Sequence, residues 1–127
     1  YFLKDTLAFS IKLFNLRLKE YNKSFNSNLI IYDRGPIDVL AYLNFKSIEI
    51  PKDLINDSKK INYEYSFILN PWRDIYTQDS VRYESYEECV LIHEFLIKEY
   101  EKFKIKLIVV PNGTINERVR FIKKFID

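Results

Sequence analysis

Hydrophobic residues in the first part of the chain recur at steps of three and four. This spacing places six of them on one stripe of a helix: Leu3, Leu7, Ile11, Phe14, Leu18 and Tyr21. The pattern predicts a helix that ends in the polar stretch 22–27. A second apolar set widens the stripe, so we expect this helix to pack between two surfaces: Phe9, Leu13 and Leu16.

Three short apolar runs predict β-strands at residues 29–32, 66–69 and 105–110. A continuous run without alternation is typical of a strand that is covered on both faces. Each run ends in residues that break regular structure, and the first ends in the charged sequence Asp33-Arg34-Gly35-Pro36. We therefore expect three buried strands with turns at their carboxyl ends.

Helical signals separate these strands. Pro36 fits the first turn of a short helix, where its missing N–H costs nothing. The spacing Ser-x-x-Glu at 85–88 and Thr-x-x-Glu at 114–117 predicts a capping box at the start of two further helices. Residues 48–65 read as a loop with one or two helical turns, and 72–83 as a loop.

The two later helices also carry apolar stripes. The stripe of the helix that begins after Ser85 is Cys89, Ile92, Leu96, Tyr100 and Phe103. On the last helix, we expect the inward residues to be Val119, Ile122 and Ile126.

Helices that alternate with strands indicate an α/β domain with a parallel sheet and right-handed crossovers. In such sheets, ligands bind beyond the carboxyl ends of the strands. Those ends are 33–35, 70–71 and 111–113. The length of 127 residues suits a single domain spanning the whole chain.

Composition narrows the function. A formal net charge of +2 argues against a dedicated nucleic-acid binder. One cysteine excludes an internal disulfide and fits a reducing compartment such as the cytoplasm, and one histidine excludes a His-rich metal site. No apolar run approaches the roughly 20 residues that span a bilayer, so we expect no transmembrane segment. The chain has no methionine, so we expect it to be processed, engineered or part of a longer protein.

The strongest chemical signal is the pair Asp33 and Arg34 directly after an apolar run. A carboxylate there can hold Mg²⁺ or accept a proton from a substrate hydroxyl. The neighbouring guanidinium offers a forked donor that matches phosphate oxygens. The alternative is an ion pair that closes a strand end, and the spacing alone favours neither.

Three segments resemble a known family. Residues 31–42 are similar to the apolar-D-R-G-x-x-D-x-x-A-Y segment of P-loop NTPases of the NadR-type (nicotinamide riboside kinase) and TRPL-translocation-defect-type AAA domain family. Residues 78–84 resemble its Q-D-x-x-R-x-E lid, and 110–122 its V-P…E-R-V-x-F-I ending. The first segment is also distantly similar to the D-R-Y/S motif of thymidylate and deoxynucleoside kinases.

The resemblance implies a three-layer P-loop kinase-like parallel sheet, a lid loop at about 71–84, and Mg²⁺ with ATP or GTP as the cofactor. It implies that Asp33 is the Mg²⁺-associated or general-base carboxylate and that Arg34 contacts phosphates. Arg82, and less directly Arg73, would neutralise charge on a transferred phosphoryl group from the lid.

The remaining implied positions line the two substrates. By resemblance, Asp38 and Tyr42 belong to the acceptor pocket, where one helical turn separates them. Asn112 and Arg118 would lie near the base of the nucleotide, although Arg118 fits a surface helix position equally well. Trp72 either stacks on a base or fixes the loop.

One departure from the family is large: the chain has only two glycines and no Walker A loop. The strand leading into that loop is central in the family, so the expected sheet is incomplete, and we expect weak or absent binding of nucleoside triphosphate. A missing N-terminal segment or a protein partner would complete it. We expect the chain to be the carboxyl-terminal part of a kinase-like NTPase that transfers a phosphoryl group to a small acceptor or to water. One alternative is a non-enzymatic nucleotide-dependent switch of the same fold. A plain interaction domain is the less favoured alternative.

Overall fold

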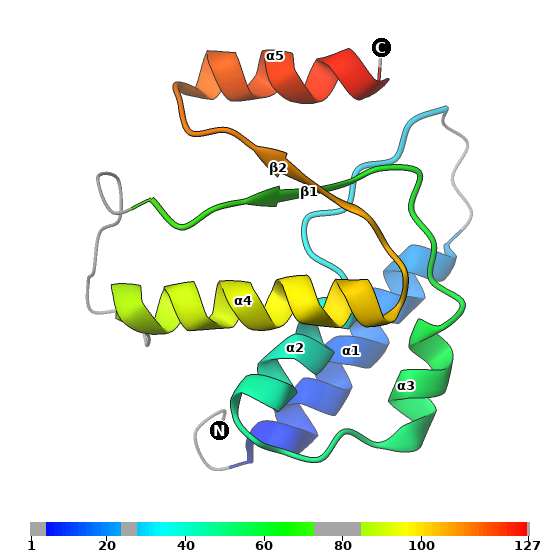
Figure 1. Cartoon of the computed structure of the whole chain (residues 1–127). Helices are drawn as coiled ribbons and strands as arrows, with labels where there is room; N and C mark the ends of the chain where they lie inside the picture. Colours follow the sequence, from blue (N-terminus) through cyan, green and yellow to red (C-terminus); the bar gives the residue numbers. More distant parts are fainter. Residues whose placement is uncertain (1–4, 24–27, 73–84, 127) are drawn as a thin grey trace. The chain divides into compact units, whose positions relative to one another are not determined.

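The computed structural model describes residues 5–23, 28–72 and 85–126, and these form five helices and two strands. Their contacts divide the chain into two compact units, residues 1–61 and 62–127. The elements of both units are labelled in Figure 1.

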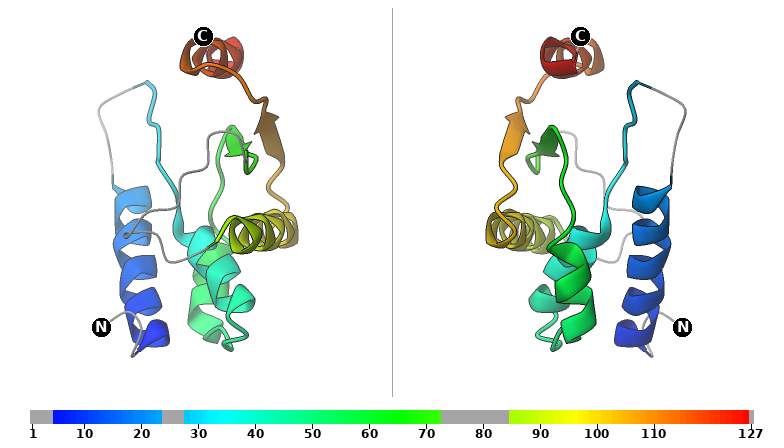
Figure 2. Two further views of the ribbon diagram at one scale, coloured as in Figure 1. Left: turned by 90° about the vertical axis from the view of Figure 1, so that its left-hand side faces the viewer. Right: turned by 90° about the vertical axis from the view of Figure 1, so that its right-hand side faces the viewer.

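The first unit contains three helices. Helix α1 spans Thr6–Asn22, and Asp5 caps its start by accepting a hydrogen bond from the backbone N–H of Ala8 at 3.0 Å. Helix α2 spans Pro36–Phe45, and α3 spans Lys52–Ser58. Helix α2 packs against both α1 and α3, and Figure 2 shows α1 and α2 side by side.

The apolar faces of these helices explain the packing. Helix α2 is almost entirely buried, which fits its apolar composition and its place between two neighbours. Only Phe14 and Ser10 of α1 are buried. The core residues of this unit are Phe14, Ile37, Val39, Leu40, Ala41, Leu43, Leu54 and Ile61.

The second unit is built around two parallel strands. Strand β1 spans Ser66–Leu69 and pairs with β2, Leu107–Val110, with Ser66 opposite Leu107. Helix α4, Tyr86–Lys102, precedes β2, and α5, Ile115–Ile126, follows it and contacts it. In Figures 1 and 2 the strand pair lies between α4 and α5.

The structure confirms a mixed α/β chain with a small parallel sheet. The capping boxes at the starts of α4 and α5 are also confirmed, with Glu88 and Glu117 as their acidic members. The finer expectation of a three-layer P-loop kinase-like sheet stays a prediction.

The expected strand at 29–32 is wrong. These residues take no regular structure, and Leu29, Ile30 and Ile31 are exposed, with Ile31 at 74%. A strand needs a hydrogen-bonded neighbour, and the described residues contain one strand pair, β1 with β2. Apolar composition alone therefore did not produce a strand here.

The expected inward face of α5 is wrong at Val119, whereas Ile122 and Ile126 are half-buried. Val119 is 47% exposed, and no residue of α5 is fully buried. Instead, Phe125 packs on the aromatic rings of Phe67 and Tyr65, with ring centroids 5.5 and 5.7 Å away, and on Phe121 at 5.5 Å. Aromatic rings offer more contact area than aliphatic side chains, so they set the face by which α5 meets the sheet.

Candidate functional site

The turn that carries Asp33 and Arg34 leads directly into helix α2. Gly35 is the N-cap of α2 and Pro36 its first residue, and both are buried. Arg34 has a φ of 69°, which lies in the left-handed region. Residues other than glycine adopt this region only at a cost in free energy. This backbone leaves Asp33 and Arg34 exposed beside the buried start of the helix.

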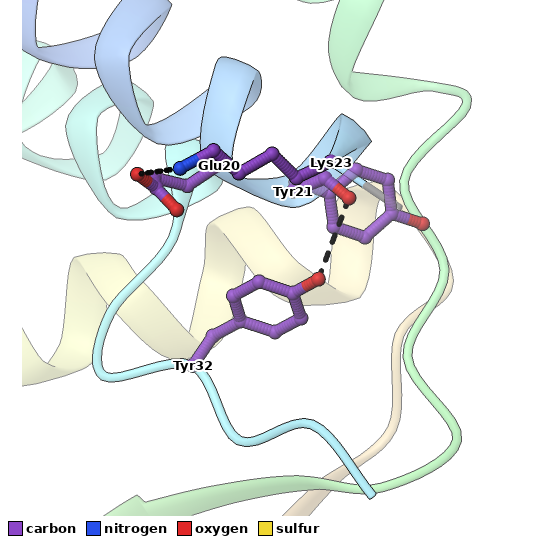
Figure 3. Close-up of polar contacts among 4 residues, drawn as sticks. All are labelled: Glu20, Tyr21, Lys23 and Tyr32. Carbon is purple, nitrogen blue, oxygen red and sulfur yellow. Dashed lines mark hydrogen bonds and ion pairs between the residues drawn. The ribbon is translucent and has the colours of Figure 1, made fainter. Parts of the chain in front are cut away.

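Helix α1 holds this turn at two points. The Tyr32 hydroxyl donates a hydrogen bond to the Tyr21 carbonyl oxygen at 3.4 Å, and the two rings lie 6.0 Å apart. One turn earlier on α1, Arg17 Nη1 donates to the Gly35 carbonyl oxygen at 3.2 Å. Figure 3 shows the Tyr32 contact beside the ion pair of Lys23 with Glu20, whose atoms are 3.2 Å apart.

A pocket of about 280 Å³ lies between α1 and the segment that ends in this turn. Its charged lining consists of two guanidinium groups and two carboxylates. The lining residues are Leu16, Arg17, Glu20, Ile31, Tyr32, Asp33 and Arg34. The exposed Arg34 guanidinium can bind phosphate oxygens, and an exposed carboxylate can hold a hydrated Mg²⁺.

The structure brings Asp33 and Arg34 to one pocket and leaves the other two expected residues of this unit elsewhere. Asp38 and Tyr42 are half-buried on α2, one turn apart as expected, but neither lines this pocket. Tyr42 packs on Phe45 with ring centroids 6.2 Å apart, and Lys46 Nζ lies 5.8 Å from its ring.

In the second unit, the carboxyl ends of the two strands meet, as parallel pairing requires. Trp72 follows β1, and the Arg118 guanidinium lies 5.7 Å from its ring centroid. Arg118 Nε also donates to the Pro111 carbonyl oxygen just after β2, at 3.4 Å. Asn112 is exposed beside this contact. A cation on an aromatic face can stack with a planar ring system.

Two expected phosphate ligands, Arg73 and Arg82, lie outside the described residues. The same holds for all of the expected lid at 71–84 except Pro71 and Trp72.

Sequence reasoning missed Arg17. Arg17 lies on the apolar stripe of α1, three residues after Phe14 and four before Tyr21. A charged residue inside an apolar stripe was the available signal. Its partner, the Gly35 carbonyl, could not be inferred, because it lies 18 residues away in sequence.

Other titratable groups add no metal site. The described residues contain no cluster of three or more His, Cys, Asp or Glu side chains placed to hold a metal ion. Burial lowers the pKa of the His93 imidazole below its ordinary value, and the negative charge of Glu94 opposes this shift. Cys89, the one cysteine of the chain, is half-buried.

Over the part of the chain that the structure describes, no helix has the length and apolar character needed to cross a bilayer.

A family model described as an AAA domain matches residues 1–118. No curated protein and no solved structure shows significant similarity to the chain. The matched range includes the turn at Asp33 and Arg34, both strands and Arg118. The chain therefore belongs to this AAA domain family, whose members are nucleotide-binding P-loop NTPase-like proteins.

Proposed function

We propose that the chain is the carboxyl-terminal part of a kinase-like P-loop NTPase that transfers the γ-phosphoryl group of ATP or GTP to a small acceptor or to water. The observation that carries the proposal is the pocket where Asp33 and Arg34 meet Arg17. Phosphoryl transfer depends mainly on positioned charges, and this pocket supplies both the Asp33 carboxylate and the Arg34 guanidinium.

Each charged group has a role in this proposal. Asp33 holds Mg²⁺ or accepts the proton of the attacking hydroxyl, and Arg34 binds phosphate oxygens. Arg82 and Arg73 neutralise charge on the transferred group. Mg²⁺ supplies electrostatic stabilisation of that charge when it is bound with the nucleotide.

The base of the nucleotide is proposed to lie at the strand ends of the second unit. Asn112 is exposed there, and Arg118 stacks on Trp72 at 5.7 Å, which suits contact with an aromatic base. Asp38 and Tyr42 are proposed to contact the acceptor, and the protein is proposed to work in the cytoplasm with this acceptor and the nucleotide as its partners.

The test uses the natural gene product that contains these 127 residues. Calorimetry with Mg-ATP and Mg-GTP measures binding, and release of nucleoside diphosphate measures turnover. We expect Asp33→Asn to lower kcat at least about 100-fold, since one positioned charge is worth that much in such sites. Asp53→Asn, at an exposed carboxylate on α3, is the matched control and should leave kcat unchanged.

A second candidate is a non-enzymatic nucleotide-dependent switch of the same fold. The observation that favours it is that Asp38 does not line the pocket of Asp33. Tight binding of Mg-nucleotide without turnover would support the switch. Absence of both binding and turnover in the natural gene product would contradict both candidates.

A further inference from the structure

We propose that Arg17 is a positioning residue that fixes the backbone of the turn carrying Asp33 and Arg34. This inference rests on the function proposed above for those two side chains. It concerns a residue outside the motifs of the sequence analysis, and it acts through a backbone oxygen rather than through substrate.

The first argument is the geometry of the contact. Arg17 Nη1 donates to the carbonyl oxygen of Gly35 at 3.2 Å, and Gly35 is buried. A carbonyl oxygen has two lone pairs, so the oxygen of an N-cap residue can serve its own helix and also accept from a side chain. The guanidinium is half-buried, where a hydrogen bond to a charged donor is stronger than in water.

The second argument is the conformation of the turn. Arg34 adopts a positive φ of 69°, and such a conformation persists only where the surroundings hold it. Arg17 donates a hydrogen bond to the carbonyl oxygen of Gly35, the residue that follows Arg34. On the other side of the turn, the Tyr32 hydroxyl donates to the Tyr21 carbonyl oxygen at 3.4 Å. The strained residue therefore lies between two contacts from one rigid helix.

The third argument is the pocket. Arg17 lines the same pocket as Asp33 and Arg34, so its contact with the Gly35 carbonyl lies at the site that the turn serves. A catalytic carboxylate displaced by about 1 Å loses on the order of 100-fold in rate. A residue that fixes the turn is therefore expected to affect kcat more than KM.

The test compares Arg17→Ala and Arg17→Lys with Lys19→Ala in the natural gene product. Lys19 is an exposed cation on the same helix and serves as the matched control. The first measurement does not depend on nucleotide: limited trypsin cleavage after Arg34, followed by mass spectrometry and normalised to cleavage after the exposed Lys59 in the same molecules. This normalisation separates local opening of the turn from general unfolding.

In Arg17→Ala we expect relative cleavage after Arg34 to rise about fivefold, because one hydrogen bond no longer opposes local opening. In an active enzyme, kcat should fall about 100-fold while KM for the nucleotide changes by less than about threefold. Arg17→Lys keeps a cationic donor, so both its relative cleavage after Arg34 and its kcat should lie between those of Arg17→Ala and wild type. Lys19→Ala should match wild type in both measurements.

Unchanged relative cleavage in Arg17→Ala overturns the inference. Faster cleavage with wild-type kcat also overturns it, because the turn would then move without consequence for the site. If the wild-type protein shows no turnover, the proposed function fails, and the cleavage ratio alone decides whether Arg17 fixes the turn.

Discussion

At the scale of single residues, Arg34 combines a proposed chemical role with an unfavourable backbone conformation. Its left-handed φ of 69° is unusual for a residue with a side chain, and its guanidinium lines the pocket beside Asp33. A residue chosen for stability alone at this position would be glycine or asparagine. The arginine is therefore better explained by the proposed contact of its side chain with phosphate oxygens than by the turn it occupies.

This conflict predicts opposite effects on stability and activity. Arg34→Gly and Arg34→Ala both remove the guanidinium, so both should lose the proposed phosphoryl transfer. Only glycine relieves the backbone strain, so the free energy of unfolding of Arg34→Gly should be about 1 kcal/mol higher than that of Arg34→Ala. Chemical denaturation of the two variants measures the difference, and equal stabilities would contradict the strained turn.

His93 gives a prediction about pH. Burial lowers the pKa of its imidazole in the folded protein, so the unfolded chain binds a proton at a higher pH than the folded chain does. Stability is therefore unaffected well above the ordinary pKa of about 6.5, and falls as pH drops through the window just below it. Chemical denaturation at several pH values between about 7.5 and 5, a range that includes this window, measures the loss of stability.

His93→Gln is the control for this measurement. The variant cannot take up the proton, so its stability should depend less on pH in that window than the wild-type stability does. Identical pH dependence in the two proteins would show that His93 is not the group responsible.

At the scale of elements, helix starts are fixed by short-range chemistry. Ser85 accepts a hydrogen bond from the Glu88 backbone N–H at 3.2 Å, and the Glu88 carboxylate accepts one from the Ser85 N–H at 3.2 Å. Thr114 and Glu117 repeat this arrangement at the start of α5, with distances of 3.1 and 2.8 Å. Hydrogen bonds from Thr114 lower the pKa of the Glu117 carboxyl group, with the bond from the Thr114 backbone N–H as the largest cause.

We expect Ser85→Ala to destabilise the protein by about 1 kcal/mol, because it leaves a backbone N–H at the start of α4 without its cap. Glu88→Gln keeps an acceptor for the Ser85 N–H and should cost less. Thermal or denaturant unfolding of both variants measures the difference. A larger loss in Glu88→Gln than in Ser85→Ala would contradict this view of the cap.

Signals of this local kind explain which elements could be predicted. The capping boxes, Pro36 at the start of α2, and strand β1 at Ser66–Leu69 could all be read from neighbouring residues. The segment 29–32 could not, because strand formation depends on a partner that the run itself does not specify. Helix α3 was expected only as one or two turns in a loop, since its seven residues carry little periodicity.

The candidate site could be predicted only in part, for the same reason. Asp33 and Arg34 are consecutive, so their shared pocket follows from the motif itself. The contact of Arg118 with Trp72 and that of Arg17 with Gly35 join distant positions, which local patterns do not reveal. The face of α5 was misjudged at Val119 because aliphatic periodicity was given more weight than the pair Phe121 and Phe125.

At the scale of the whole molecule, burial is unevenly distributed. Helix α2 carries most of the fully buried side chains of its unit, whereas α5 has none and leaves Ile115 79% exposed. The strands of the second unit are short, and Leu69 and Val109 each remain about half exposed. Local stability should therefore differ widely along the chain.

Hydrogen exchange measures this difference. We expect the slowest amides in α2, around Leu40 to Leu43, and fast exchange at residues 29–32, where the backbone forms no regular structure. Residues 66–69 and 107–110 should fall between them, since a two-stranded sheet has marginal stability. Protection at 29–32 equal to that of α2 would show that this segment is paired in solution.

The four-residue interval between Arg17 and Tyr21 sets the spacing of the two contacts by which α1 holds the turn. Each added residue rotates the following part of an α-helix by about 100°, so one insertion between these positions would separate the two anchors around the helix circumference. Only one of them could then meet the segment at 32–35. Natural variation in the length of this stretch should therefore come in whole turns, while substitutions at outward positions such as Lys19 are tolerated freely.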